Sequence, residues 1–234
     1  MIRIRRSQQR GHADLGWLDT RYTFSFADYH DPDHVQFGPL RVINQDRIAP
    51  GAGFPTHGHR DMEIVTYVLE GAVAHKDSMG NGSEIRAGEV QIMSAGRGVT
   101  HSEFNASETE PLHLLQMWVF PRKKSTEPRY GQKQFSDELS GKLRVVVSGD
   151  GRDGSLQIDQ DVRLFASRLE PGQQVAHDLE DGRLAWLHVA TGAVTLNGEE
   201  LREGDGAAIE DESRLEIEGR EGADLVLWDL PTLE

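Results

Sequence analysis

Residues 51–82 read GAGFPTHGHRDMEIVTYVLEGAVAHKDSMGNG, and this stretch contains most of the signals that decide the fold. Its run EIVTYVL, residues 63–69, alternates β-branched and aromatic residues in the manner of a largely buried β-strand rather than a helix. The dipeptide Asn81-Gly82 is a strong signal for a tight hairpin turn, and Asn197-Gly198 repeats it later. The stretch therefore predicts strands joined by short turns.

Short apolar runs separated by Gly, Pro, Asn or Asp recur through the rest of the chain. This regular punctuation is typical of an all-β sandwich or barrel. We interpret the polar stretch from Phe120 to about Lys142 as a connection that contains a short helix near Ser136 to Leu139. The other predicted strands cover residues 40–43, 72–76, 88–93, 113–120, 143–148, 164–169, 184–189, 193–196 and 225–228.

The glycine spacing indicates two divergent copies of one unit. Pro50-Gly51 precedes Gly71-Ala72-Val73 at the same distance at which Pro171-Gly172 precedes Gly192-Ala193-Val194. We therefore predict a first domain at 1–122, a linker at 123–142 and a second domain at 143–234. In this register Asp178 and Glu180 take the places of His57 and His59, which predicts a solvated acidic loop in the second copy. His177 and His188 are interpreted as structural.

Two pairs of side chains in the first copy form a candidate metal site. In a strand, residues i and i+2 point to the same face, so His57 can converge with His59, and His101 with Glu103. The chain contains ten histidines, so the first pair alone is weak evidence, and the second pair strengthens it. Imidazole and carboxylate suit Fe, Mn, Co, Ni, Cu or Zn and leave coordination positions open.

Composition narrows the class of partner. The chain has 234 residues, a net charge of −14 and no cysteine, so disulfides and thiolate chemistry are excluded. The acidic surface would repel a phosphate backbone or an anionic membrane, and we expect no direct nucleic-acid contact. No apolar run approaches the length of about 20 residues that a membrane span needs, and the expected location is the cytoplasm.

Three segments resemble the pirins, a branch of the cupin superfamily. They are GHADLGWLDTRYTFSFADY at 11–29, FPTHGHRDMEIVTYVLEGAVAHKDSMGN at 54–81 and QIMSAGRGVTHSEFN at 91–105. Ser94 stands where cupins usually have proline, and two extra residues precede His101. The resemblance implies a bicupin, two face-to-face jelly-roll barrels with a few short helices and metal only in the N-terminal one. It implies His57, His59, His101 and Glu103 as ligands and Glu63 as a neighbour of the ligands.

Bacterial pirin-like proteins with this pattern are known as quercetin 2,3-dioxygenases, which open the central ring of a flavonol with dioxygen and release carbon monoxide. The resemblance therefore implies a flavonol substrate and one divalent ion, with Fe(II) expected first and Mn, Co, Ni, Cu or Zn as alternatives. Glu103 is our candidate for both ligand and catalytic base, because a carboxylate that leaves the metal can take the hydroxyl proton. We expect a monomer.

A flat polyphenol needs an apolar pocket, although each candidate residue can equally be ordinary core. His113 and Gln116 are candidates to orient ligands or substrate, and loop Asp28–His34 is interpreted as solvated, with a lid role near the barrel mouth. The predicted pocket residues are Phe24, Phe26, Phe54, Met93, Phe104 and Met117.

Two other functions remain open from the sequence. Some pirins resemble regulators that bind a transcription factor or a metabolic enzyme, with a redox-sensitive metal in place of a catalyst. A sugar isomerase with Zn is a third reading, which the apolar candidates Phe54, Met93 and Phe104 disfavour. Flavonol turnover with metal-dependent oxygen uptake would distinguish the enzyme from the regulator.

Overall fold

Every apolar run predicted as a strand lies in a strand of the computed structural model, which describes residues 1–233. The predicted helix near 136–139 is a single 3₁₀ turn, η2 (Ser136–Glu138), and the other helical turns are η1 (Ser7–Gln9) and η3 (Arg152–Gly154). The all-β class is confirmed. Within residues 1–233, no helix has the length and apolar character needed to cross a membrane.

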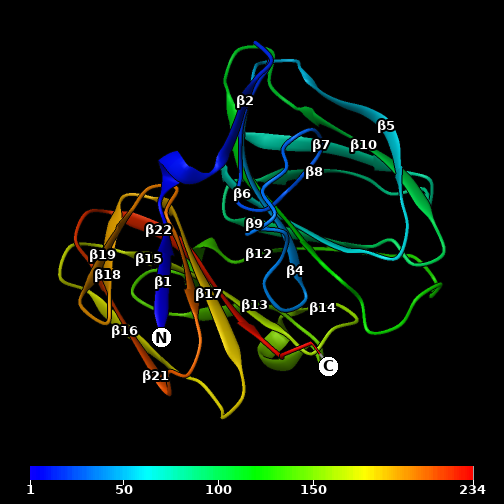
Figure 1. Ribbon diagram of the computed structural model, residues 1–234. Coiled ribbons are helices and arrows are strands. Elements are labelled where there is room, and N and C mark those ends of the chain that lie inside the picture. The colour runs from blue at the N-terminus through cyan, green and yellow to red at the C-terminus, as the bar shows by residue number, and fades with distance from the viewer. Residues whose placement is uncertain (234) are drawn as a thin grey trace.

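The N-terminal barrel consists of a seven-stranded and a four-stranded sheet (Figure 1). The first has the order β12-β9-β6-β11-β4-β3-β2 and the second β5-β10-β7-β8. Their strands are β2 (Gly11–Asp14), β3 (Leu18–Tyr22), β4 (Leu40–Ile48), β5 (Gly53–His59), β6 (Glu63–Glu70), β7 (Ala72–Asp77), β8 (Gly82–Arg86), β9 (Glu89–Ser94), β10 (Val99–Asn105), β11 (Leu112–Val119) and β12 (Arg129–Gln134).

The C-terminal barrel repeats this plan, as the glycine spacing predicted. Its sheets have the orders β1-β20-β17-β22-β15-β13-β14 and β16-β21-β18-β19. Their strands are β1 (Ile2–Arg5), β13 (Arg144–Ser148), β14 (Leu156–Gln157), β15 (Arg163–Leu169), β16 (Gln174–Asp178), β17 (Leu184–Thr191), β18 (Ala193–Leu196), β19 (Glu199–Arg202), β20 (Gly206–Ile209), β21 (Arg214–Gly219) and β22 (Ala223–Leu230).

Two strands that the sequence analysis did not recognise depart from the predicted domain and linker bounds. The first strand, β1, pairs with β20 and so closes the edge of the C-terminal sheet, although we placed residues 1–122 in the first domain. The expected linker 123–142 contains β12, which pairs with β9 at the equivalent edge of the N-terminal sheet. β12 (RYGQKQ) lacks an apolar periodicity, and the alternation of β1 (IRIR) covers only four residues at the chain start and does not say which sheet the strand joins.

The largest apolar cluster lies between the two barrels. It joins residues from both seven-stranded sheets, among them Val65 and Met117 of the N-terminal barrel and Trp186 and Trp228 of the C-terminal barrel. The indole Nε1 of Trp228 donates to the Met117 Sδ atom at 3.4 Å. Burial of apolar surface between the two sheets therefore holds the barrels face to face.

The interior of the C-terminal barrel is filled by aliphatic side chains. Leu215 and Ile217 are buried there on β21, together with Val194 and Leu196 of β18. Asp178 and Glu180 have mostly exposed side chains that pair with Arg214 and Arg163, respectively, at the surface. Both positions are solvated as predicted, but Asp178 belongs to β16 rather than to a loop, and both carboxylates pair with arginines.

The two predicted hairpins differ in length. Asn197 and Gly198 form a two-residue turn between β18 and β19, with φ of 47° and 88°, as a type I′ turn requires. The other connection comprises residues 78–81, and Gly82 already belongs to β8. There the Asp77 carboxylate accepts from the backbone N–H groups of Met79 and Asn81 and determines the longer turn.

A buried hydrogen bond between the barrels is open to a stability test. The Tyr67 hydroxyl group donates to the Asp224 carboxylate at 2.9 Å, and both side chains are buried. Tyr67→Phe removes this bond without leaving a large void. We expect it to lower the free energy of unfolding by about 1–3 kcal/mol, measured by urea denaturation. An unchanged midpoint would show that the hydroxyl group contributes nothing to the union of the barrels.

Candidate metal centre

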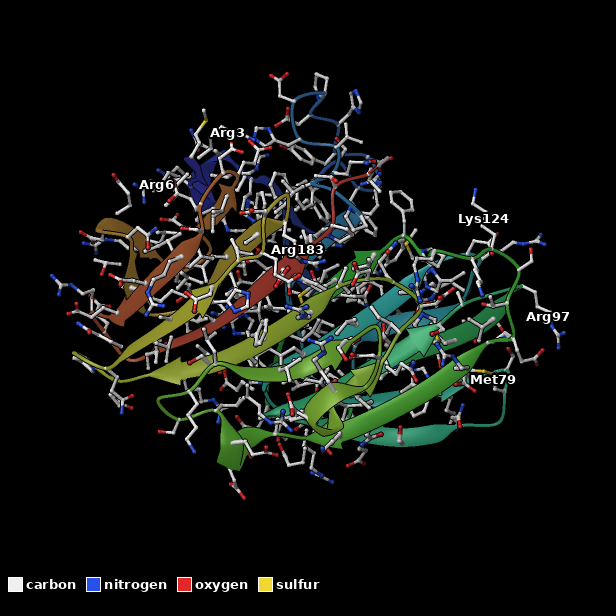
Figure 2. The ribbon with its side chains drawn as sticks, turned by 90° about the horizontal axis from the view of Figure 1, so that it is seen from below. Arg3, Arg6, Met79, Arg97, Lys124 and Arg183 are labelled. Atoms are coloured by element: carbon white, nitrogen blue, oxygen red, sulfur yellow. The ribbon has the colours of Figure 1, made fainter. Side chains whose placement is uncertain are left out.

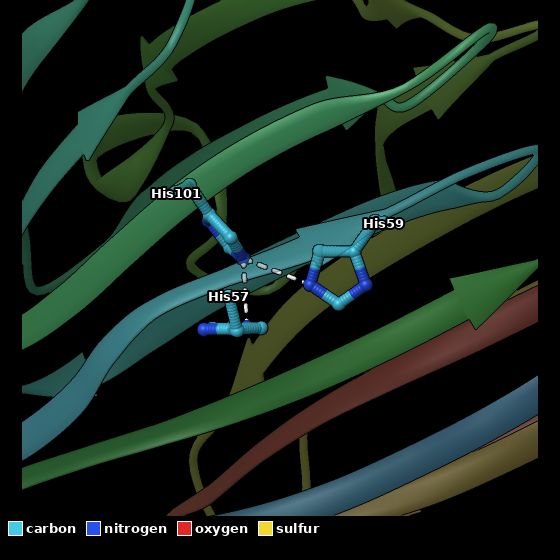
Figure 3. Close-up of side chains that lie close together, drawn as sticks. All are labelled: His57, His59 and His101. Atoms are coloured by element: carbon cyan, nitrogen blue, oxygen red, sulfur yellow. Dashed lines mark hydrogen bonds between the residues drawn. The ribbon is translucent and has the colours of Figure 1, made fainter.

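Three of the predicted ligands come together at one place on the N-terminal barrel. His57 and His59 lie on β5, and His101 lies directly opposite His57 on the neighbouring strand β10. A bulge between the pairs His101–His57 and Glu103–Phe54 shifts the register of β5. In Figure 3 the three imidazoles point toward a common centre from these two strands. The i,i+2 argument from sequence therefore describes the local geometry correctly.

The separations of the ring nitrogens fit a bound metal ion. The Nε2 atom of His101 lies 2.9 Å from Nε2 of His59 and 3.1 Å from Nε2 of His57. Two nitrogens at about 2.1 Å from an ion, at about 90° to each other, would be about 3.0 Å apart. The Nε2 atom of His101 thus lies from each of the other two at the spacing of adjacent ligands on a five- or six-coordinate ion, and all three ligand atoms lie within 4.8 Å of one another.

The tautomer and the protonation state of these imidazoles also favour metal binding. His57 Nδ1 lies 2.8 Å from the Pro55 carbonyl oxygen, and donation there leaves Nε2 free to bind a metal. Burial, followed by the neighbouring imidazoles, lowers the pKa of His101 to about 3. Burial and the nearby His57 lower the pKa of His59 to about 4. The neutral form, which binds metals, therefore predominates for His59 and His101 at neutral pH.

Glu103 lies beside this group without being part of it. It points inward from β10, and one of its carboxylate oxygens lies within 4.8 Å of ligand atoms of His101 and His75. Burial raises the pKa of Glu103 to about 7. Gln116 Nε2 donates to Oε2 of Glu103 at 2.8 Å, while Trp118 Nε1 donates to Oε1 of Gln116 at 3.2 Å.

These hydrogen bonds give the Glu103 carboxylate a defined orientation. The donation from Trp118 identifies which end of the Gln116 amide is oxygen, so the amide nitrogen faces Glu103. The Trp118 ring also packs edge-on against His59, with 4.9 Å between ring centroids. One chain of contacts thus links Glu103 to a histidine of the three-histidine group.

His75 is a buried neighbour that the sequence analysis missed. Its Nδ1 accepts from Gln91 Nε2 at 3.3 Å, so its Nε2 carries the proton that faces Asp77 Oδ2 at 3.2 Å. Tyr130 stacks on the ring at a centroid distance of 4.9 Å. Both ring nitrogens therefore have protein partners, and His75 supports the site without a free lone pair. The signal in the sequence is the inward i,i+2 pair His75-x-Asp77, next to Val73.

These polar groups form a layer across the barrel. Leu114, Val68 and Val73 fill one end of the interior, and Ile64, Met93 and Val99 fill the other. Successive inward positions on each strand lie between these two ends. The residues of this polar layer are Thr66, His75, Gln91, His101, Glu103 and Gln116.

The predicted pocket residues divide into two groups. Phe54 packs near His57, at 6.4 Å between centroids, and Phe26 packs against Trp118 at 5.2 Å. Met93 is buried among the apolar residues at the same end of the barrel as Trp118. Phe54 and Phe26 thus lie near the three histidines, directly or through Trp118, while Met93 is fully buried core.

The remaining three pocket candidates lie elsewhere. Phe24 and Met117 belong to the core between the barrels. Met117 alternates along β11 with the inward-facing Gln116 and Trp118, so its side chain points to the other barrel. Phe104 alternates with the inward-facing His101 and Glu103 on β10 and is 37% exposed. Strand alternation therefore turns Met117 and Phe104 away from the metal centre, while Phe24 follows β3 and packs against Trp186 of the other barrel.

Glu63 and His113 also face away from the histidines. Glu63 shares a face of β6 with Val65 and accepts a hydrogen bond from Ser94 Oγ at 2.5 Å. The His113 Nε2 atom lies 3.1 Å from Gln45 Nε2, in a buried group between the barrels. Among the residues predicted to support the ligands, Gln116 is thus the one that contacts a predicted ligand within residues 1–233.

Comparison with known proteins places the two halves in families. Residues 3–119 match the family model named Pirin, and residues 145–230 match a model described as the quercetinase C-terminal cupin domain. A protein named quercetin 2,3-dioxygenase from Escherichia coli strain K12 is 49% identical over 231 residues, which cover 99% of each chain. A pirin-like protein from Caulobacter vibrioides is 43% identical over 94% of this chain and 95% of its own.

A solved structure shares the same fold over its whole length. It is the bacterial pirin YhhW from Escherichia coli in complex with nickel(II), with a TM-score of 0.94, 47% identity and full coverage of both chains. The two-barrel cupin architecture is thereby confirmed, and metal binding is a property of the family. The family models and the near full-length similarity show that this chain belongs to the pirin family.

Proposed function

We propose that this pirin is a quercetin 2,3-dioxygenase, which cleaves the central ring of flavonols such as quercetin with dioxygen and releases carbon monoxide. The observation that carries the proposal is the convergence of three imidazole Nε2 atoms beside a buried, oriented carboxylate. The names of near full-length relatives support the same reaction.

The proposed metal ligands are His57, His59 and His101, with Glu103 as a fourth when its carboxylate turns toward them. We propose Fe(II) as the native ion, and the solved nickel(II) complex of the Escherichia coli pirin supports a divalent metal ion in this family. The ion would lower the pKa of the flavonol 3-hydroxyl group.

Glu103 is the proposed base for that hydroxyl group. Its carboxylate is buried beside His101, and Gln116 holds one oxygen while the other lies 3.5 Å from Thr66 Oγ1. A buried carboxylate with a raised pKa accepts a proton more readily than a solvated one. After proton transfer, the neutral acid can donate a hydrogen bond back to the substrate oxygen.

The approach to the site suits a flat substrate. His57 and His59 are partly exposed, whereas His101 is buried, so the open side of the group lies toward β5. Phe26, Phe54 and Trp118 present aromatic rings beside it. Such rings stack with the fused rings of a flavonol and exclude water from the deprotonated hydroxyl group.

Removal of one ligand tests the metal assignment. We expect His57→Ala to lose stoichiometric metal after anaerobic reconstitution and to release no carbon monoxide from quercetin and oxygen. His30→Ala is the matched control, because His30 is an exposed histidine of the loop at 28–34. Metal analysis with headspace carbon monoxide measures both variants. Full metal content and turnover in His57→Ala would refute the assignment, and turnover by none of the six ions in wild type would favour the regulatory function.

Replacement of the proposed base separates binding from chemistry. Glu103→Gln keeps the shape and retains an oxygen that can accept from Gln116, so we expect it to keep most of the bound metal. We expect kcat to fall by about 10²-fold or more, because the amide cannot take the hydroxyl proton. Steady-state oxygen uptake with quercetin measures the effect. Unchanged kcat at full metal occupancy would remove Glu103 from this role.

A further inference from the structure

A cavity lies at the junction of the two barrels, lined by residues other than the three histidines and Glu103. It has a volume of about 560 Å³ and is lined by β1, by the segment from Phe24 to Phe37 and by β17 and β20. This volume falls in the range of small-molecule sites, which lie preferentially at domain junctions. Its surroundings combine aromatic faces with guanidinium groups.

The register of the C-terminal sheet shapes the floor of this cavity. Arg3 of β1 pairs with Ala208 of β20, and Ala208 pairs with Trp186 of β17. All three line the cavity, with the small alanine side chain in the middle of the row. Neighbouring strands lie about 4.8 Å apart, so the space above Ala208 between its two large neighbours is about one aromatic ring wide.

Aromatic side chains form one wall of the space. Phe24 and Phe37 pack around Trp186, with ring centroids at 5.0 and 5.6 Å. The indole of Trp186 lies over Gly206, where a β-carbon would come within 2.7 Å of the ring. The ring is therefore fixed in place, and its buried Nε1 atom has no acceptor within residues 1–233.

Arg5 provides the polar end of the cavity. This side chain is 5% exposed, and its Nη2 atom donates to the Tyr29 hydroxyl group at 2.9 Å and to Asp31 Oδ2 at 3.1 Å. Its buried Nε atom has no acceptor among the described residues, although it belongs to a cavity-lining arginine. A buried donor without an acceptor is costly, and an oxygen from a ligand would satisfy it.

The nearby carboxylates already have other partners, so the acceptor for the Arg5 Nε–H group would come from a ligand. Asp31 already accepts from Arg5, Tyr29 and the backbone N–H of Asp33, and its Oδ2 lies 2.9 Å from His34 Nδ1. Arg3, which Figure 2 shows on the N-terminal strand beside the C-terminal strands, adds a second guanidinium group and pairs with Glu210. Asp33 is exposed to solvent, so its charge is screened.

We propose that this cavity binds a small planar aromatic carboxylate of the phenolic-acid class. The ring would occupy the space above Ala208 beside Trp186, and the carboxylate would accept from Arg5. The inference is independent of the proposed dioxygenase reaction, because it uses none of the residues of the metal centre. The segment 28–34, which the sequence suggested as a lid, is then the wall of this site, held to β1 through Asp31.

The test uses 4-hydroxybenzoate as the probe and isothermal titration calorimetry as the readout, on the metal-loaded full chain. We expect saturable binding to wild type and to His57→Ala, because the cavity is separate from the histidines. The uncharged 4-hydroxybenzamide is expected to bind at least about tenfold more weakly than the acid, because a charge-assisted hydrogen bond is lost.

Two variants test the location. Arg5→Met removes the guanidinium group, and Ala208→Leu fills the floor while leaving the Arg5–Asp31 pair intact. Each is expected to weaken binding about tenfold or more. Arg220→Met changes the net charge equally at an exposed arginine and is expected to bind like wild type. Circular dichroism and the thermal midpoint establish that each variant is folded.

Several results would overturn the inference. They are the absence of binding to wild type at about 10 mM probe, loss of binding in His57→Ala, and unaltered affinity in a folded Ala208→Leu. Equal affinity for the amide and the acid would overturn the assignment of a carboxylate. Because the readout is binding, a failure of dioxygenase activity would leave this proposal standing.

Discussion

The direct pairing of β5 with β10 is the constraint on which the metal centre depends. His57 and His101 face each other across these two strands, and His59 shares the face of His57 because it lies two residues further along β5. Neither strand could be shifted by one residue without turning its histidines to the outside, because side chains alternate between the faces of a sheet. The register of β5 against β10 therefore determines whether the three imidazoles meet.

The two barrels show how one strand plan produces different interiors. Both have the same order of strands in their sheets, yet the N-terminal barrel contains a polar layer and the C-terminal barrel contains aliphatic side chains. A polar layer costs free energy unless its groups find hydrogen-bond partners, and here several of them bond to one another, while His101 Nδ1 and Gln91 Oε1 have no partner among the described residues. Gln116 bonds Glu103, Trp118 bonds Gln116, and Gln91 bonds His75. The interior of the C-terminal barrel is apolar core, and the polar side chains that converge lie in the N-terminal barrel.

The position of β1 at the edge of the C-terminal sheet brings the candidate metal centre and the cavity next to one stretch of chain. Strand β1 leaves the N-terminal half to complete the C-terminal sheet, and it brings Arg5 next to the segment that includes Tyr29 and Asp31. The same segment contributes Phe26, whose ring packs on Trp118 beside His59. One stretch of chain therefore borders both the metal centre and the cavity between the barrels.

The sequence by itself determined the all-β class, the repeat and the histidines that meet. Strand alternation is a local property, so His57-x-His59 and His101-x-Glu103 could be assigned to shared faces before any contact was known. Alternation does not say which face looks into the barrel. Only the tertiary structure turned Glu63, His113 and Met117 toward the other barrel and brought His75 to the interior, because the neighbouring strands decide where each face points. It also placed β1 in the opposite sheet, which no local pattern encodes, since the pairing joins residues near both ends of the chain.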